Sequence, residues 1–165
     1  MFTNSKEYAN PIVIFSLDRP GKPQGRMAAN WLTFKGVPCL QGLGSWEGAT
    51  ETSVAFEPPT DPGFWESFVG LVRQYEQEAI TLVFTPLSDR EGRRSAFVPV
   101  SLLDKDGFFP ALFFKNSYKS YVLNYLIQLD WKTVSKTFAE SQPGYSMFPD
   151  ALGHKVYWLA SSVED

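Results

Sequence analysis

A proline-rich segment, Pro58-Pro59-Thr60-Asp61-Pro62, fixes the point where the first half of this chain changes from strand to helix. Proline removes a backbone donor, so it interrupts a strand ladder, yet it suits the first position of a helix. Asp61 directly precedes Pro62 and is a favoured N-cap residue. The segment therefore predicts a strand that ends before residue 58 and a helix that begins at residue 62.

The elements on either side of this segment follow from their apolar patterns. In the helix, apolar residues recur at spacings of three, four and seven, which predicts a buried stripe and an end at Tyr75-Glu76-Gln77-Glu78. Four further segments of residues 11–85 have recognisable patterns: a strand at 12–17, a helix at 26–35, a hairpin with arms 39–46 and 51–56 and a loose or bulged turn, and a strand at 80–84. The order strand, helix, hairpin, helix, strand predicts an α+β, ferredoxin-like split βαβ sandwich, an antiparallel sheet with two helices on one face.

The chain is expected to form a single domain over residues 1–165, with 11–85 as its core and an extended C-terminal third, 86–165, packed on that core. Three elements are predicted in this extension: a strand at 97–102, a helix from the cap Asn116 to Leu129, and a strand at 155–160 after a loop at 144–153.

Composition excludes several classes of function. Fifteen basic and eighteen acidic side chains give a net charge of −3, which offers no broad footprint for nucleic acid. The only cysteine, Cys39, has apolar neighbours and is expected to be a buried, inert thiol, and the only histidine, His154, a solvated loop residue. A zinc site, a histidine triad and a disulfide framework are therefore not expected. No signal peptide or membrane-spanning segment is expected either, which predicts a soluble, cytoplasmic protein.

Two polar residues near element ends are the candidates for a functional site. Glu51 enters a strand of small and apolar residues, where a carboxylate needs a hydrogen bond, an ion pair or a cationic ligand. Gln77 falls at the predicted end of the second helix. Solvated side chains at both positions remain the alternative interpretation.

The segments around these residues resemble a known family. They are Gly44-Ser45-Trp46-Glu47-Gly48 followed by Glu51-Thr52-Ser53, and the helix and strand of residues 68–84 with Gln77 between them. This pattern resembles the phage S-adenosylmethionine lyases, formerly called SAM hydrolases. A family of small uncharacterised bacterial domains with a similar pattern, which implies no known activity, is the other resemblance. The aromatic residue here is Trp46, where the lyase family favours tyrosine.

The lyase resemblance implies that Glu51 and Gln77 are catalytic and that Trp46 and Ser53 bind substrate. It implies intramolecular cleavage of S-adenosylmethionine to methylthioadenosine and homoserine lactone, which depletes the methyl donor and serves phage anti-restriction in the host cytoplasm. Neither a metal nor a cofactor is implied, and a homotrimer is. The alternative function is a non-enzymatic phage counter-defence or small-ligand-binding protein, for which the exposed surface would come from Phe108, Phe109, Phe113 and Phe114.

Overall fold

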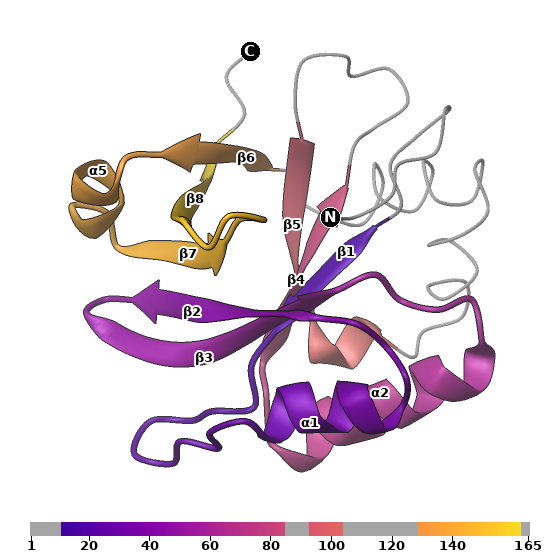
Figure 1. Cartoon of the computed structure of the whole chain (residues 1–165). Coiled ribbons are helices and arrows are strands. Elements are labelled where there is room, and N and C mark those ends of the chain that lie inside the picture. Colours follow the sequence, from indigo (N-terminus) through magenta and orange to yellow (C-terminus); the bar gives the residue numbers. More distant parts are fainter. Residues whose placement is uncertain (1–10, 85–92, 104–128, 163–165) are drawn as a thin grey trace.

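A computed structural model describes residues 11–84, 93–103 and 129–162 of the chain (Figure 1). In these residues eight strands form a single sheet: β1 (Ile12–Phe15), β2 (Leu40–Trp46), β3 (Ala49–Phe56), β4 (Ala79–Phe84), β5 (Arg93–Pro99), β6 (Leu129–Val134), β7 (Gly144–Pro149) and β8 (Lys155–Ser162). The helices among the described residues are α1 (Met27–Phe34), α2 (Pro62–Gln74), the 3₁₀ turn η1 (Val100–Leu102) and α5 (Lys136–Glu140).

The sheet closes on itself, in the order β1-β3-β2-β7-β8-β6-β5-β4, with β4 paired to β1. All the pairs between neighbouring strands are antiparallel. The prediction of an open, ferredoxin-like sandwich is therefore wrong. It fails because β5 pairs with β4 and β7 pairs with β2, so strands from the C-terminal half join both edges of the sheet that β1 to β4 would otherwise leave open.

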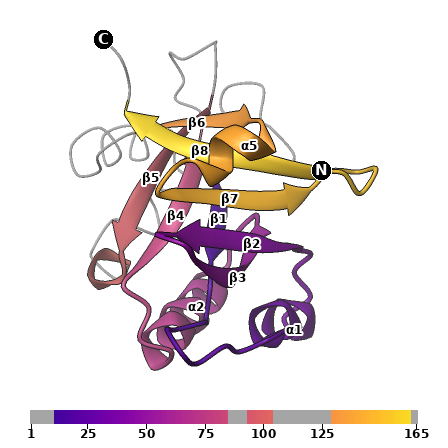
Figure 2. The same ribbon diagram turned by 90° about the vertical axis from the view of Figure 1, so that its left-hand side faces the viewer.

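Two apolar cores lie on opposite faces of this sheet. The larger core lies outside the barrel, where α1 and α2 cover one side of the sheet (Figures 1 and 2). Phe68 of α2 is fully buried there and makes ring contacts with Phe15, Phe56, Phe64 and other aromatic side chains. The smaller core fills the barrel interior with side chains from five strands, namely Ile12, Ile14, Ala55, Val83, Trp131 and Phe148. An eight-stranded barrel is just wide enough for such a filling or for one small ligand.

The local signals around the second helix and the hairpin are partly confirmed. Asp61 caps α2 by accepting a hydrogen bond from the Gly63 N–H at 2.9 Å, as predicted. The hairpin turn is tighter than expected, because only Glu47 and Gly48 separate the paired residues Trp46 and Ala49. Both turn residues have positive φ (50° and 84°), as type I′ turns require, so β3 begins two residues before the predicted start.

The C-terminal predictions fare unevenly. The final strand is confirmed as β8. The strand predicted at 97–102 is confirmed only to Pro99, because β5 runs from Arg93 to Pro99 and residues 100–102 form the 3₁₀ turn η1. Residues 144–149, expected to be loop, form β7, and β6 begins at Leu129, where a helix was expected to end. The rest of that helix and the phenylalanine pairs of the alternative function lie outside the described residues. Within the described part of the chain, no helix has the length and apolar character needed to cross a membrane.

Candidate functional site

The predicted site residues of the hairpin all lie on the inward face of the barrel. Directly opposite residues of an antiparallel pair share a face, and side chains alternate along a strand. Trp46 is opposite Ala49, so Trp46, Glu51, Ser53 and Ala55 share one face. Ala55 belongs to the interior core. Along β3, this inward face is therefore apolar at Ala55 and becomes polar at Ser53 and Glu51, towards the hairpin end.

Glu51 lies over a glycine of the neighbouring strand. A Cβ atom built on Gly44 would lie 3.5 Å from Glu51 Oε1 and 3.1 Å from Ser53 Oγ, so both polar side chains border the space that the missing Gly44 side chain leaves. Ser53 is buried, whereas Glu51, nearer the hairpin end, is exposed. Within residues 11–84, 93–103 and 129–162, no hydrogen bond or ion pair of the Glu51 side chain is found. Partial burial raises the pKa of Glu51 above its ordinary value, and the nearby Asp18 carboxylate raises it further.

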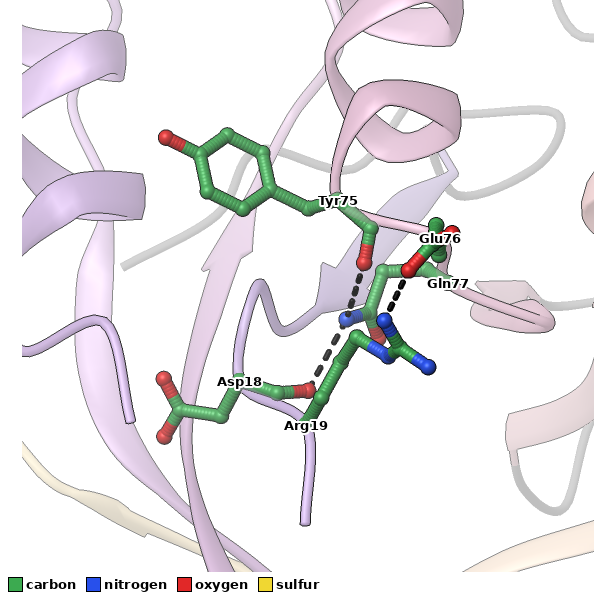
Figure 3. Close-up of polar contacts among 5 residues, drawn as sticks. All are labelled: Asp18, Arg19, Tyr75, Glu76 and Gln77. Carbon is green, nitrogen blue, oxygen red and sulfur yellow. Dashed lines mark hydrogen bonds and ion pairs between the residues drawn. The ribbon is translucent and has the colours of Figure 1, made fainter. Parts of the chain in front are cut away.

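Asp18 connects three separate segments of the chain next to Glu51. Its Oδ2 accepts a hydrogen bond from the Thr52 N–H at 2.8 Å, and its Oδ1 accepts one from the Gln24 N–H at 2.7 Å. Its backbone carbonyl accepts a third, from Gln77 Nε2, at 2.9 Å. Figure 3 shows this carbonyl directed at the Gln77 amide while the Asp18 carboxylate points away from it. Asp18 therefore lies between the two residues that the sequence selected.

The position of Gln77 follows from the way in which α2 ends. The helix ends at Gln74 with Tyr75 as its C-cap, so Gln77 is not on the last helical turn as predicted. The Glu76 N–H donates to Arg73 O and the Gln77 N–H to Val72 O, which is the hydrogen-bond pattern of a Schellman motif. Glu76 occupies the left-handed position (φ 52°) where glycine is usual, and its carboxylate pairs with Arg19.

This turn directs the Gln77 side chain back towards the segment after β1. Besides its bond to Asp18, Gln77 Nε2 lies 3.4 Å from Tyr75 O (Figure 3). Both contacts use the amide nitrogen. The half-buried amide is thus fixed by backbone carbonyls on its donor side, and its oxygen forms no hydrogen bond within the described residues.

Trp46 lies at the hairpin end of the same face, with its ring against the backbone of β7. A Cβ atom built on Gly144 would lie 2.6 Å from Trp46 Cε3, so this ring position requires glycine at residue 144. The side chain nevertheless remains 64% exposed. Trp46 lies diagonally across from Glu51, two register positions along the hairpin, since residue 46 is opposite 49 and residue 44 is opposite 51. An aromatic ring at such a diagonal position is within reach of its neighbour.

The structure therefore places Trp46, Glu51 and Ser53 on one face and links Gln77 to them through Asp18. Asp18 directly follows the strand predicted at residues 12–17 and was not among the predicted site residues, because its role depends on contacts with residues 34 and 59 positions away. Comparisons with models of protein families, with curated proteins and with solved structures find no match to this chain.

Neither of the other two residues singled out by type belongs to this site. Cys39 packs against the outer core, and burial raises the pKa of its thiol, an effect that Arg26 partly opposes. Cys39 is half-buried rather than buried as predicted, and a raised thiol pKa agrees with the predicted lack of reactivity. The His154 side chain is 74% exposed, and its Nδ1 lies 3.5 Å from Asp150 Oδ2 in the β7–β8 connection. This confirms a solvated loop histidine. The described ranges contain no group of three or more histidine, cysteine or acidic side chains that could hold a metal ion.

Proposed function

We propose that this protein is an S-adenosylmethionine lyase whose site is the inward face that carries Trp46, Glu51 and Ser53, with Gln77 linked to it through Asp18. The observation that carries the proposal is the Glu51 carboxylate. It faces inward, its pKa is raised, and it forms no hydrogen bond or ion pair within the described part of the chain. A partly desolvated carboxylate beside a second one, Asp18, favours a cationic ligand.

S-adenosylmethionine carries two cationic groups, an α-ammonium and a sulfonium. In the proposed reaction one oxygen of its own carboxylate attacks the γ-carbon. The carbon–sulfur bond breaks, and its electron pair stays on sulfur. The products are neutral methylthioadenosine and homoserine lactone, which keeps its ammonium group, and no proton is transferred. No protein nucleophile or base takes part, so the protein acts by holding the attacking oxygen and the γ-carbon in line.

The charges that disappear decide where Glu51 should bind. The substrate carboxylate and the sulfonium both lose their charge as the ring closes, so a protein carboxylate placed against the sulfonium would stabilise the substrate more than the transition state. The α-ammonium keeps its charge throughout. Glu51 therefore anchors the α-ammonium in this proposal, and the Gln77 amide hydrogen-bonds to the methionine part of the substrate.

Trp46 supplies the remaining recognition. Its ring is packed on one side against Gly144 and is largely exposed, which suits stacking on adenine or contact with the sulfonium. The family resemblance adds a homotrimer and a role in phage anti-restriction to this proposal.

The test is incubation of the purified protein with S-adenosylmethionine, followed by liquid chromatography and mass spectrometry for methylthioadenosine and homoserine lactone. Wild type is expected to form both products, and Glu51→Gln to lose at least about 10-fold in kcat/KM, the effect of removing one charged hydrogen bond. Glu47→Gln removes the same charge from an exposed turn position of the same hairpin and is expected to keep wild-type activity.

Absence of both products from folded wild-type protein would refute the lyase proposal. Calorimetry with an analogue in which an amine replaces the sulfonium then separates two cases. Binding that depends on Glu51 would indicate a protein that sequesters a cationic nucleoside. Absence of binding would refute the proposal that this face is a binding site.

A further inference from the structure

Asp18 makes the contacts that would keep the two proposed catalytic residues in register. Its two carboxylate oxygens and its carbonyl accept hydrogen bonds from Thr52, Gln24 and Gln77, all between 2.7 and 2.9 Å. We propose that Asp18 is a positioning residue that holds Glu51 and Gln77 in a fixed relation to one bound ligand. This inference rests on the proposed lyase function.

The geometry supports positioning because each contact controls a different neighbour. Thr52 lies between Glu51 and Ser53 in β3. The hydrogen bond that its N–H donates to Asp18 therefore fixes the position of this part of β3 relative to the segment after β1. The bond from Gln77 Nε2 to the Asp18 carbonyl fixes the amide of the α2–β4 turn against the same segment. Hydrogen bonds to an ionised carboxylate are stronger than neutral ones, so the Asp18 side chain restrains β3 and Gln24 more firmly than a neutral residue would, while the Asp18 backbone carbonyl holds Gln77.

The residues across the sheet from Glu51 are uncharged, so Asp18 is the charged group that acts on its carboxylate. On β2, the residue opposite Glu51 is Gly44, and on β7 the residue opposite Gly44 is Ser146, neither of which carries a charge. Arg19 and Glu76, the charged neighbours of Asp18 and Gln77, form an ion pair with each other. Within the described residues, Asp18 is the charged group that raises the pKa of Glu51.

The strained turn at Glu76 belongs to the same arrangement. A non-glycine residue in the left-handed region costs about 1 kcal/mol, and such strain persists where the surrounding contacts require it. Here the turn is what directs Gln77 towards Asp18, and the pairing of Glu76 with Arg19 joins the same two segments a second time (Figure 3).

The test compares Asp18→Asn with Asp150→Asn. Asparagine at residue 18 retains one acceptor oxygen but places an amide NH₂ against one of the two backbone donors. Asp150 also accepts two backbone hydrogen bonds, from Leu152 and His154, but through Oδ1 alone, which asparagine preserves. Asp18→Asn is expected to lower kcat/KM for S-adenosylmethionine by roughly 10- to 100-fold, and Asp150→Asn to leave it unchanged.

A pH profile distinguishes positioning from a merely structural role. Binding of the ammonium requires ionised Glu51, so kcat/KM falls at acidic pH with a midpoint that reports the pKa of Glu51. Removal of the Asp18 charge lowers that pKa, so the midpoint of Asp18→Asn is expected at lower pH than that of wild type. Loss of folded protein alone would reduce activity without moving the midpoint in that direction.

Nuclear magnetic resonance of the free protein keeps this inference separate from the proposed activity. The carboxyl carbon of Glu51, assigned with Glu51→Gln, should titrate at lower pH in Asp18→Asn, and the side-chain amide signals of Gln77 should shift. If wild type is inactive but both changes appear, the lyase proposal fails and the positioning role of Asp18 stands. An unchanged Glu51 titration and unchanged Gln77 signals would overturn the inference, whatever the activity.

Discussion

The close approach of β7 to Gly42 of β2 offers a direct test of the closed barrel. A Cβ atom built on Gly42 would overlap the Met147 carbonyl oxygen and lie 2.6 Å from Phe148 Cδ1. Phe148 could rotate, but Met147 O belongs to the backbone of β7, which pairs with β2 at this point. Gly42→Ala therefore requires β2 and β7 to separate.

The expected cost has two parts. Overpacking of a filled site costs about 1–3 kcal/mol, and disturbance of one or two ladder hydrogen bonds costs about 1 kcal/mol each. Alanine also restricts the unfolded chain, which returns about 0.4–1 kcal/mol. The net free energy of unfolding should fall by about 3 kcal/mol, which for a domain of this size corresponds to a decrease in Tm of roughly 6–12 °C.

Urea unfolding followed by tryptophan fluorescence and far-UV circular dichroism measures this effect. The control is Gly70→Ala, because Gly70 is an exposed helical residue of α2 and a Cβ atom there would meet nothing within 4 Å. It should stabilise the protein by about 0.5–1 kcal/mol. If Gly42→Ala were as stable as wild type, β7 would not cover Gly42, and the seam between β2 and β7 would be wrong.

Two further predictions concern the site and the outer core. Folding raises the pKa of Glu51, so its stability contribution is complete below the ordinary value of 4.5 and is lost as the pH rises through the raised value. Glu51→Gln should therefore have a higher Tm than wild type at pH 7, and calorimetry across pH should show the difference disappear below pH 4.5; a constant difference would contradict the raised pKa. Phe68→Ala should lower the free energy of unfolding by about 3–5 kcal/mol, because its ring is fully buried against other aromatic rings. Phe34→Ala is the matched control, since Phe34 is 86% exposed, and urea unfolding should show a change within about 0.5 kcal/mol; similar losses in both variants would mean that the helices do not pack as described.

The sequence was informative where an element depends on nearby residues. The N-cap Asp61 with Pro62, and the β-branched run of β1, each specify an element through contacts within a few positions. Closure of the sheet is a different matter, because a strand pattern does not identify the partner strand. The alternation of Leu129 and Trp131 with Asp130 and Lys132 was a usable signal for β6, whereas the glycine and proline at the ends of β7 suggested a loop.

The site shows the same division. Glu51 and Ser53 lie two residues apart on a strand, so their common face follows from local periodicity. The position of Gln77 depends on a Schellman motif with glutamate in place of glycine, which the sequence does not reveal, and the helix was therefore extended too far. Asp18 had no distinguishing neighbour, because two of its three partners, Thr52 and Gln77, lie 34 and 59 positions away.

The seam between β2 and β7 has a consequence for the newly made chain. The pair Leu43 and Met147 joins residues that are 147 − 43 = 104 positions apart, so this contact forms late and contributes to slow folding. Until residues 144–149 have been synthesised, β2 has an unpaired edge that another chain could join. The glycines of β2 weaken its tendency to pair as a strand, which lowers that risk during synthesis. The glycines that make room for Phe148 and Glu51 in the finished barrel thus also make the β2 edge a weaker template for another strand before the barrel closes.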